Sequence, residues 1–179
     1  QYDGKPVKAS RLFAGRVHED GVKRIAEYFN QDPVKYRSMV FNPEIITMLQ
    51  NNAEPKRSAH ELIQGSVFEE RELADFLTDE EAYHRLMLDI MESQVASTSL
   101  LLKNSNIKRI FVDGGFSRNA IYMNLLATAF PGLEVFAASV AQATALGAAL
   151  SIHKAWNKKP LPNDMIKLQY YGSLVRASI

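Results

Sequence analysis

The stretch from residue 107 to residue 156 constrains the fold more than any other part of the chain, because it alternates strand-like and helix-like segments with short links. The apolar run 107–112 predicts a buried strand, and 133–136 predicts a second strand. Between them lies a helix that Ser117 is expected to cap and that Pro131 ends. Two strands joined through a helix are expected to run parallel with a right-handed crossover. The sequence therefore predicts an α/β domain.

A helix rich in small residues is expected after the second strand. Ser139 and Gln142 have the spacing of a capping box at its start. Gly147 lies inside this helix, where glycine costs up to about 1 kcal/mol relative to alanine. We expect Gly147 to let the helix pack closely against the sheet or a neighbouring helix, with a ligand contact as the alternative. Trp156 ends the helix and is predicted to pack as an anchor.

Upstream of residue 107 the patterns are mostly helical. A helix is predicted over 18–29, and a shorter one begins after the N-cap residue Asn42. The segment 58–77 has no clear period. Thr78 opens a capping box and a long helix that runs to about Lys103. One side of this long helix is predicted to be apolar and to carry Tyr83, Leu86, Met87, Ile90, Met91, Val95 and Thr98.

The first residues suggest that a preceding strand is missing from the sequence. Asp3 and Gly4 favour a hairpin turn, and a strand is predicted over 7–14. A hairpin turn at this position needs a strand before it. We therefore expect this chain to be part of a longer protein. The alternative is an irregular N-terminal tail.

Composition excludes several classes of partner and site. Lys and Arg number 21 and Asp and Glu number 20, so the chain lacks the concentrated basic charge that nucleic acids or anionic membranes require. We therefore expect neither partner. The absence of cysteine excludes disulfides and thiolate chemistry and fits a cytoplasmic protein. The four histidines are scattered, so no metal site is predicted.

The best candidate site follows the first predicted strand, at Gly114, Gly115 and Phe116. Open α/β sheets bind ligands at the carboxyl ends of their strands. Two glycines let a flat base or a phosphate approach the backbone, and the next helix offers N–H groups to an anion. Asn119 carries an amide that can donate to and accept from a purine edge. The alternative is a sharp turn without a ligand, since neither a P-loop nor a dinucleotide fingerprint is present.

Two motifs in this region carry a resemblance to a known family. The run 110–119, Ile-Phe-Val-Asp-Gly-Gly-Phe-Ser-Arg-Asn, is followed at 143–149 by Ala-Thr-Ala-Leu-Gly-Ala-Ala. This pair resembles the C-terminal lobe of the FGGY carbohydrate kinases, which include glycerol kinase, xylulokinase, rhamnulokinase and fuculokinase. The resemblance implies an actin-like, ribonuclease H-like fold, with a mixed sheet flanked by helices and ATP bound between two lobes. It places Gly114, Gly115 and Phe116 along the adenosine and Asn119 at the adenine.

The same resemblance implies a function that this chain does not complete alone. Residues 1–179 would form the nucleotide-binding lobe, and the catalytic Asp and most sugar contacts would lie in a preceding N-terminal lobe. The reaction would transfer the γ-phosphoryl group of ATP to the hydroxyl of a ketose or related sugar, with Mg²⁺ bound to the nucleotide. ATP, a small sugar, the preceding lobe and a possible second copy of the chain are the implied partners. Two alternatives stay open: a non-catalytic actin-like domain that senses nucleotide or binds a partner, and a purely structural α/β module.

Overall fold

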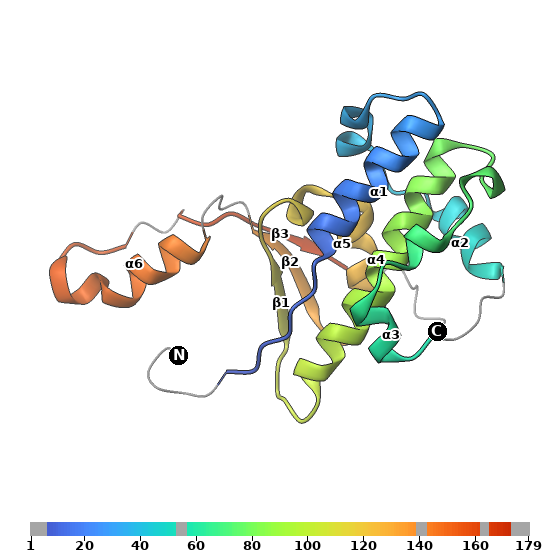
Figure 1. Cartoon of the computed structure of the whole chain (residues 1–179). Coiled ribbons are helices and arrows are strands. Elements are labelled where there is room, and N and C mark those ends of the chain that lie inside the picture. Colours follow the sequence, from blue (N-terminus) through green and yellow to red (C-terminus); the bar gives the residue numbers. More distant parts are fainter. Residues whose placement is uncertain (1–6, 53–56, 139–142, 162–164, 173–179) are drawn as a thin grey trace.

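The computed structural model describes residues 7–52, 57–138, 143–161 and 165–172. Helices pack on one another and against one face of a three-stranded sheet, while α6 projects away from the sheet (Figure 1). The elements are α1 (Ala14–Tyr28), η2 (Pro33–Ser38), α2 (Pro43–Asn51), α3 (Ala59–Gln64), η3 (Val67–Glu70), η4 (Leu73–Asp75), α4 (Asp79–Leu102), β1 (Arg109–Val112), η5 (Phe116–Arg118), α5 (Ala120–Ala129), β2 (Glu134–Ala138), α6 (Ala143–Trp156) and β3 (Leu168–Tyr171).

The long helix α4 organises the helical part, since α1, α2, α3 and α5 all contact it. The predicted start of α4 is confirmed, because the Thr78 side chain accepts a hydrogen bond from the Glu81 amide. The Glu81 carboxylate accepts a hydrogen bond from the backbone N–H of Leu77 and not from that of Thr78, so only half of the capping box is formed. The predicted apolar side is buried from Tyr83 to Met91. Because helices surround this part of α4, every residue from 82 to 91 is buried.

Charged side chains on α4 are buried together with their partners. Asp89 is 2% exposed and accepts two hydrogen bonds from Arg71, at 2.6 and 2.8 Å. Arg85 donates to the backbone carbonyl of Leu49 at 3.0 Å. A buried charge without a partner is strongly destabilising, so these contacts allow the charges to remain in the core.

The N-terminal part differs from the sequence expectation. The predicted strand over 7–14 is wrong, because residues 7–13 have no regular structure and α1 begins at Ala14. This segment instead runs beside α4, where the hydroxyls of Ser10 and Ser97 are 2.7 Å apart. Since α1 begins earlier than predicted, His18 lies inside the helix and not in its first turn. The Asp3-Gly4 turn lies outside the described residues.

The α1–α4 crossing is close at Gly21. A Cβ atom at this position would lie 2.6 Å from Cδ1 of Leu86. The predicted apolar face of α1 is confirmed, since Val22, Ile25 and Ala26 are all buried. The middle of α1 is therefore held beside the first half of α4.

The sheet is mixed. β1 and β2 are parallel, as predicted, with Ile110 opposite Val135, and β3 adds an antiparallel strand that the sequence did not indicate. The prediction that β1 is buried is wrong, because Phe111 is 56% exposed. Helices cover only one face of the sheet among the described residues. On the other face the ring of Phe136 lies 5.4 Å from Phe111 and 5.5 Å from Tyr170.

The predicted helix with small residues is present as α6, but its predicted packing is wrong. None of its described side chains, from residue 145 to residue 156, is buried. A Cβ atom at Gly147 would meet no atom of the described residues within 4 Å, so this glycine serves no close packing against them. Trp156 is 65% exposed and is no anchor. The predicted capping box at 139–142 lies outside the described residues.

Candidate functional site

The Gly-Gly turn directly follows β1. Gly114 has a φ of 74°, in the left-handed region that favours glycine, while Gly115 has ordinary helical angles. The Ser117 hydroxyl donates to the carbonyl of Gly114 at 2.9 Å and fixes the turn. A Cβ atom at either glycine would meet no atom of the described part of the chain within 4 Å. Gly114 is therefore required by the backbone conformation of the turn, and both glycines leave a surface that a ligand can approach.

Asn119 caps the helix that follows the turn. Its Oδ1 accepts from the Tyr122 amide at 2.9 Å, and α5 begins at Ala120. The prediction that Ser117 caps this helix is wrong, because residues 116–118 form a 3-10 turn that delays the helix start. The helix was also expected to offer its first N–H groups to an anion, but the N–H of Tyr122 already donates a hydrogen bond to Asn119.

A cleft of about 570 Å³ opens beside the turn and is within the size range of small-molecule sites. Three of the four predicted site residues, Gly115, Phe116 and Asn119, line it together, and Gly114 directly precedes them without lining it. The whole lining consists of Gly15, His18, Glu19, Arg37, Tyr83, Gly115, Phe116, Arg118 and Asn119. The first turns of α1 thus face the Gly-Gly turn across the cleft.

The inner wall of the cleft is a hydrogen-bonded row of side chains. The hydroxyl of Tyr83 lies 2.9 Å from Nε2 of His18 and accepts from Nδ2 of Asn119 at 2.7 Å. The ring of Phe116 packs edge-on against His18 at 5.6 Å and stacks on Tyr122 at 4.4 Å. These contacts hold three parts of the chain in one surface.

Burial sets the charge of this wall. It raises the pKa of Tyr83 to about 12, against a smaller lowering by the hydrogen bond from Asn119. Burial also lowers the pKa of His18 below its usual 6.5, and the negative charge of Glu19 opposes this shift. Both Tyr83 and His18 are therefore neutral at pH 7.

Two cations at the rim give the cleft a positive character. Arg37 and Arg118 are exposed and line the cleft, and within the described part of the chain neither guanidinium makes a hydrogen bond or an ion pair. Glu19 is the carboxylate among the lining residues. A guanidinium presents a planar set of donors that matches phosphate and carboxylate oxygens. The cleft thus combines an aromatic wall, an open glycine turn and free donors for an anion.

Sequence reasoning missed the side of the cleft formed by Gly15, His18, Arg37 and Tyr83. Tyr83 was predicted on the apolar side of α4, and its ring is fully buried, but its hydroxyl also accepts a hydrogen bond from Asn119 in the cleft wall. Nothing in the local sequence near His18 or Arg37 indicates that they lie opposite a turn far along the chain. Their role becomes visible only once α1 and η2 are packed against α4.

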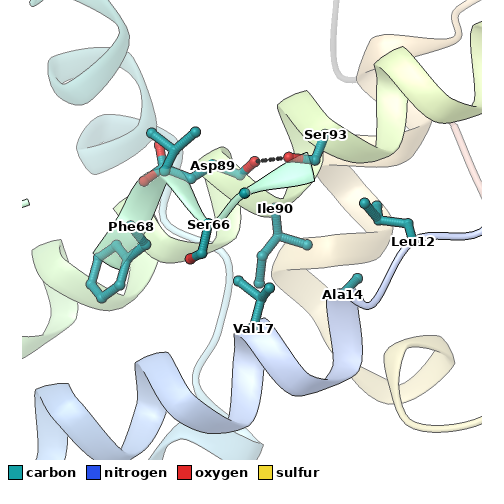
Figure 2. A pocket seen from close by; sticks show the side chains of 10 residues that line it. Leu12, Ala14, Val17, Ser66, Phe68, Asp89, Ile90 and Ser93 are labelled. Carbon is teal, nitrogen blue, oxygen red and sulfur yellow. Dashed lines mark hydrogen bonds between the residues drawn. The ribbon is translucent and has the colours of Figure 1, made fainter. Parts of the chain in front are cut away.

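One other hollow is too small for a nucleotide. The hollow between α1, α4 and the 65–68 segment measures about 20 Å³, which holds little more than one water molecule (Figure 2). No group of three or more His, Asp or Glu side chains among the described residues is arranged to hold a metal ion. Over the same residues, no helix combines the length and apolarity needed to cross a membrane.

Comparison with known proteins gives one match. Residues 39–156, more than half of the chain, match the model of the C-terminal domain of the FGGY family of carbohydrate kinases. Neither a curated protein nor a solved structure matches the chain. The matched segment contains Tyr83, the Gly-Gly turn and Asn119, whereas His18 and Arg37 precede it.

Proposed function

The chain belongs to the FGGY family of carbohydrate kinases, and from this we propose that residues 1–179 form the nucleotide-binding C-terminal lobe of a cytoplasmic, ATP-dependent sugar kinase. ATP would occupy the cleft between α1 and the Gly-Gly turn. The fold expected for such a lobe is actin-like, and the mixed sheet with helices on one face is consistent with it. The kinase itself would comprise this lobe and a second one.

The observation that carries this proposal is the meeting of Gly115, Phe116 and Asn119 in one cleft of nucleotide size. The open backbone at Gly115 would lie along the ribose and base, with Gly114 flanking it. The half-buried Asn119 amide would pair with the edge of the adenine. Arg118, at the same turn, would contact the phosphates.

The residues of this lobe fit a role in binding and not in proton transfer. No catalytic residue is proposed in the described part of the chain, and the base that takes the proton from the sugar hydroxyl would lie in a preceding lobe. Bound Mg²⁺ would neutralise phosphate charge during transfer of the γ-phosphoryl group, and no ligand from this chain is proposed for it. Because positional and electrostatic catalysis need both walls of the active site, the isolated chain should transfer no phosphate.

The sugar would be a ketose or a related small sugar, bound mainly by the preceding lobe. The row of Phe111, Phe136 and Tyr170, whose two outer rings are exposed, is a surface through which isolated lobes could associate. Adding the preceding lobe should restore sugar phosphorylation. A full-length protein with an intact catalytic Asp that binds ATP but phosphorylates no sugar would instead support a nucleotide-sensing domain.

A calorimetric titration of the chain with ATP tests nucleotide binding directly. Asn119→Ala should abolish or strongly weaken the binding, since it removes the proposed contact with the base. This substitution also removes a helix cap, which costs about 1 kcal/mol of stability. Asn42→Ala is the matched control, because Asn42 caps α2 in the same way and does not line the cleft. A folded chain that releases no heat with ATP, or an Asn119→Ala variant with unchanged affinity, would refute the proposal.

A further inference from the structure

We propose that His18 and Tyr83 are positioning residues that hold the side-chain amide of Asn119 in a single orientation, and that this makes the cleft select between 6-aminopurine and 6-oxopurine nucleotides. The inference rests on the proposed function for the nucleotide itself, but the fixed amide is a property of the chain alone. His18 lies outside the segment that matches the family model.

Both ends of the Asn119 amide make a hydrogen bond within the chain. Oδ1 of Asn119 accepts from the backbone amide of Tyr122 at 2.9 Å, and Nδ2 donates to the hydroxyl of Tyr83 at 2.7 Å. Turning the amide by 180° would bring its NH₂ group against the backbone N–H, so that two donors would face each other. The contact with the Tyr122 amide thus favours the observed orientation, and the contact with Tyr83 supports it as long as the hydroxyl oxygen is the acceptor.

The hydroxyl of Tyr83 is itself held in place. Its ring is fully buried and packs against Tyr36 at a centroid distance of 5.0 Å. Since the oxygen accepts from Asn119, the hydroxyl proton is free to be donated to Nε2 of His18, 2.9 Å away. This requires a neutral His18 with its own proton on Nδ1, and the burial that lowers the pKa of His18 favours that form.

The Asn119 amide can still form hydrogen bonds with a ligand. One N–H and one lone pair remain after the two internal hydrogen bonds. At the C6 and N1 positions, adenine presents a donor and then an acceptor, whereas hypoxanthine presents an acceptor and then a donor. A freely rotating amide can pair with either base by turning over. An amide held in one orientation pairs well with only one of them, and with ATP as the nucleotide this is the 6-aminopurine.

The selectivity test compares ATP with ITP, whose bases differ only at C6 and N1. The wild-type chain should bind ATP about tenfold more tightly than ITP, in line with the loss of one good hydrogen bond. Tyr83→Phe should reduce this ratio at least about threefold, because it removes the hydroxyl that holds Nδ2. Tyr122→Phe is the matched control: it removes a hydroxyl from another buried ring, leaves the backbone amide of residue 122 in place and should keep the ratio.

A second pair of variants keeps the test decisive if Tyr83→Phe does not fold. His18 is only half-buried, and His18→Ala removes the acceptor of the Tyr83 proton. His18→Gln supplies an acceptor again and should restore the ATP to ITP ratio that His18→Ala lowers. A merely structural role for His18 predicts equal effects of both variants on the ratio, and that result would overturn the proposal.

A measurement without nucleotide separates this inference from the proposed function. In NMR spectra, the side-chain NH₂ signals of Asn119 should exchange with water more slowly than those of exposed asparagines, and exchange should accelerate in Tyr83→Phe but not in Tyr122→Phe. Unchanged exchange in Tyr83→Phe would disprove the fixed amide. If the wild-type chain binds neither nucleotide, the proposed function and the selectivity fail, while the exchange data still decide whether the amide is held.

Discussion

Gly21→Ala should weaken both the fold and the cleft, although alanine is the better helix former. Gly21 lies in the middle of α1 and is buried against α4. A Cβ atom there would lie 2.6 and 2.8 Å from the two terminal methyl carbons of Leu86, and 3.3 Å from its Cγ. Carbon atoms pack best at about 3.5–4.0 Å, so α1 and α4 would have to separate by about 1 Å or Leu86 would have to leave its buried position.

Two effects of opposite sign determine how much Gly21→Ala changes the free energy of unfolding. Forcing an extra methyl group into a packed core costs about 1–3 kcal/mol, and replacing glycine by alanine inside a helix returns up to about 1 kcal/mol. We therefore expect a net loss of about 1 kcal/mol in the free energy of unfolding. Separation of the helices by about 1 Å would also stretch the 2.9 Å contact between His18 and Tyr83 beyond hydrogen-bond length, so ATP affinity should fall as well.

Urea unfolding followed by circular dichroism gives the free energy, and calorimetry gives the affinity. Gly147→Ala is the control, because it makes the same exchange inside a helix where a Cβ atom meets no described atom within 4 Å, and it should not destabilise the chain. Leu86→Ala should cancel part of the Gly21→Ala loss, so the double variant should be more stable than additivity predicts. A Gly21→Ala chain as stable as the Gly147→Ala chain would refute the reasoning.

Three further perturbations probe the core and the cleft. Asp89→Ala removes the buried carboxylate that accepts two hydrogen bonds from Arg71 and should cost about 3–5 kcal/mol in urea unfolding, as expected for a broken buried ion pair. Because folding lowers the pKa of His18, the unfolded chain takes up the proton first as pH falls below 6.5, and the free energy of unfolding should decrease in that range. In unfolding curves measured at a series of pH values, His18→Gln should remove the part of this decrease that His18 causes. Arg118→Gln should weaken ATP binding about tenfold and reduce its salt dependence in titrations at two ionic strengths, whereas Arg16→Gln, which affects only an exposed ion pair, should change neither.

The features that the sequence predicted well are those set by neighbouring residues. Asn42 and Thr78 both cap the helices that they were expected to cap, because the first amides of a helix need acceptors and a side chain two or three residues away can supply one. The parallel pairing of β1 and β2 follows similarly from the helix between them. Local chemistry decides these features before any tertiary contact forms.

The errors concern features that depend on distant partners. The apolar residues of 7–14 suit a strand, but no strand of the described structure pairs with them, and the segment lies along α4 instead. The small residues of α6 suit close packing, yet Gly147 faces open space in the described structure. For the candidate site, the sequence identified the side formed by Gly115, Phe116 and Asn119 but not the side formed by α1, because no local pattern indicates which surface a helix will face.

The spacing of the cleft residues along the chain also has a kinetic consequence. The hydroxyl of Tyr83 joins His18, 65 residues before it, to Asn119, 36 residues after it. Contacts between such distant residues pay loop-closure entropy and are favoured only after the intervening helices have docked. We therefore expect the row of side chains to form after the folding transition state. Substitutions in it should speed unfolding and leave the folding rate nearly unchanged, so the cleft should open from a folded chain more readily than the helical core around α4.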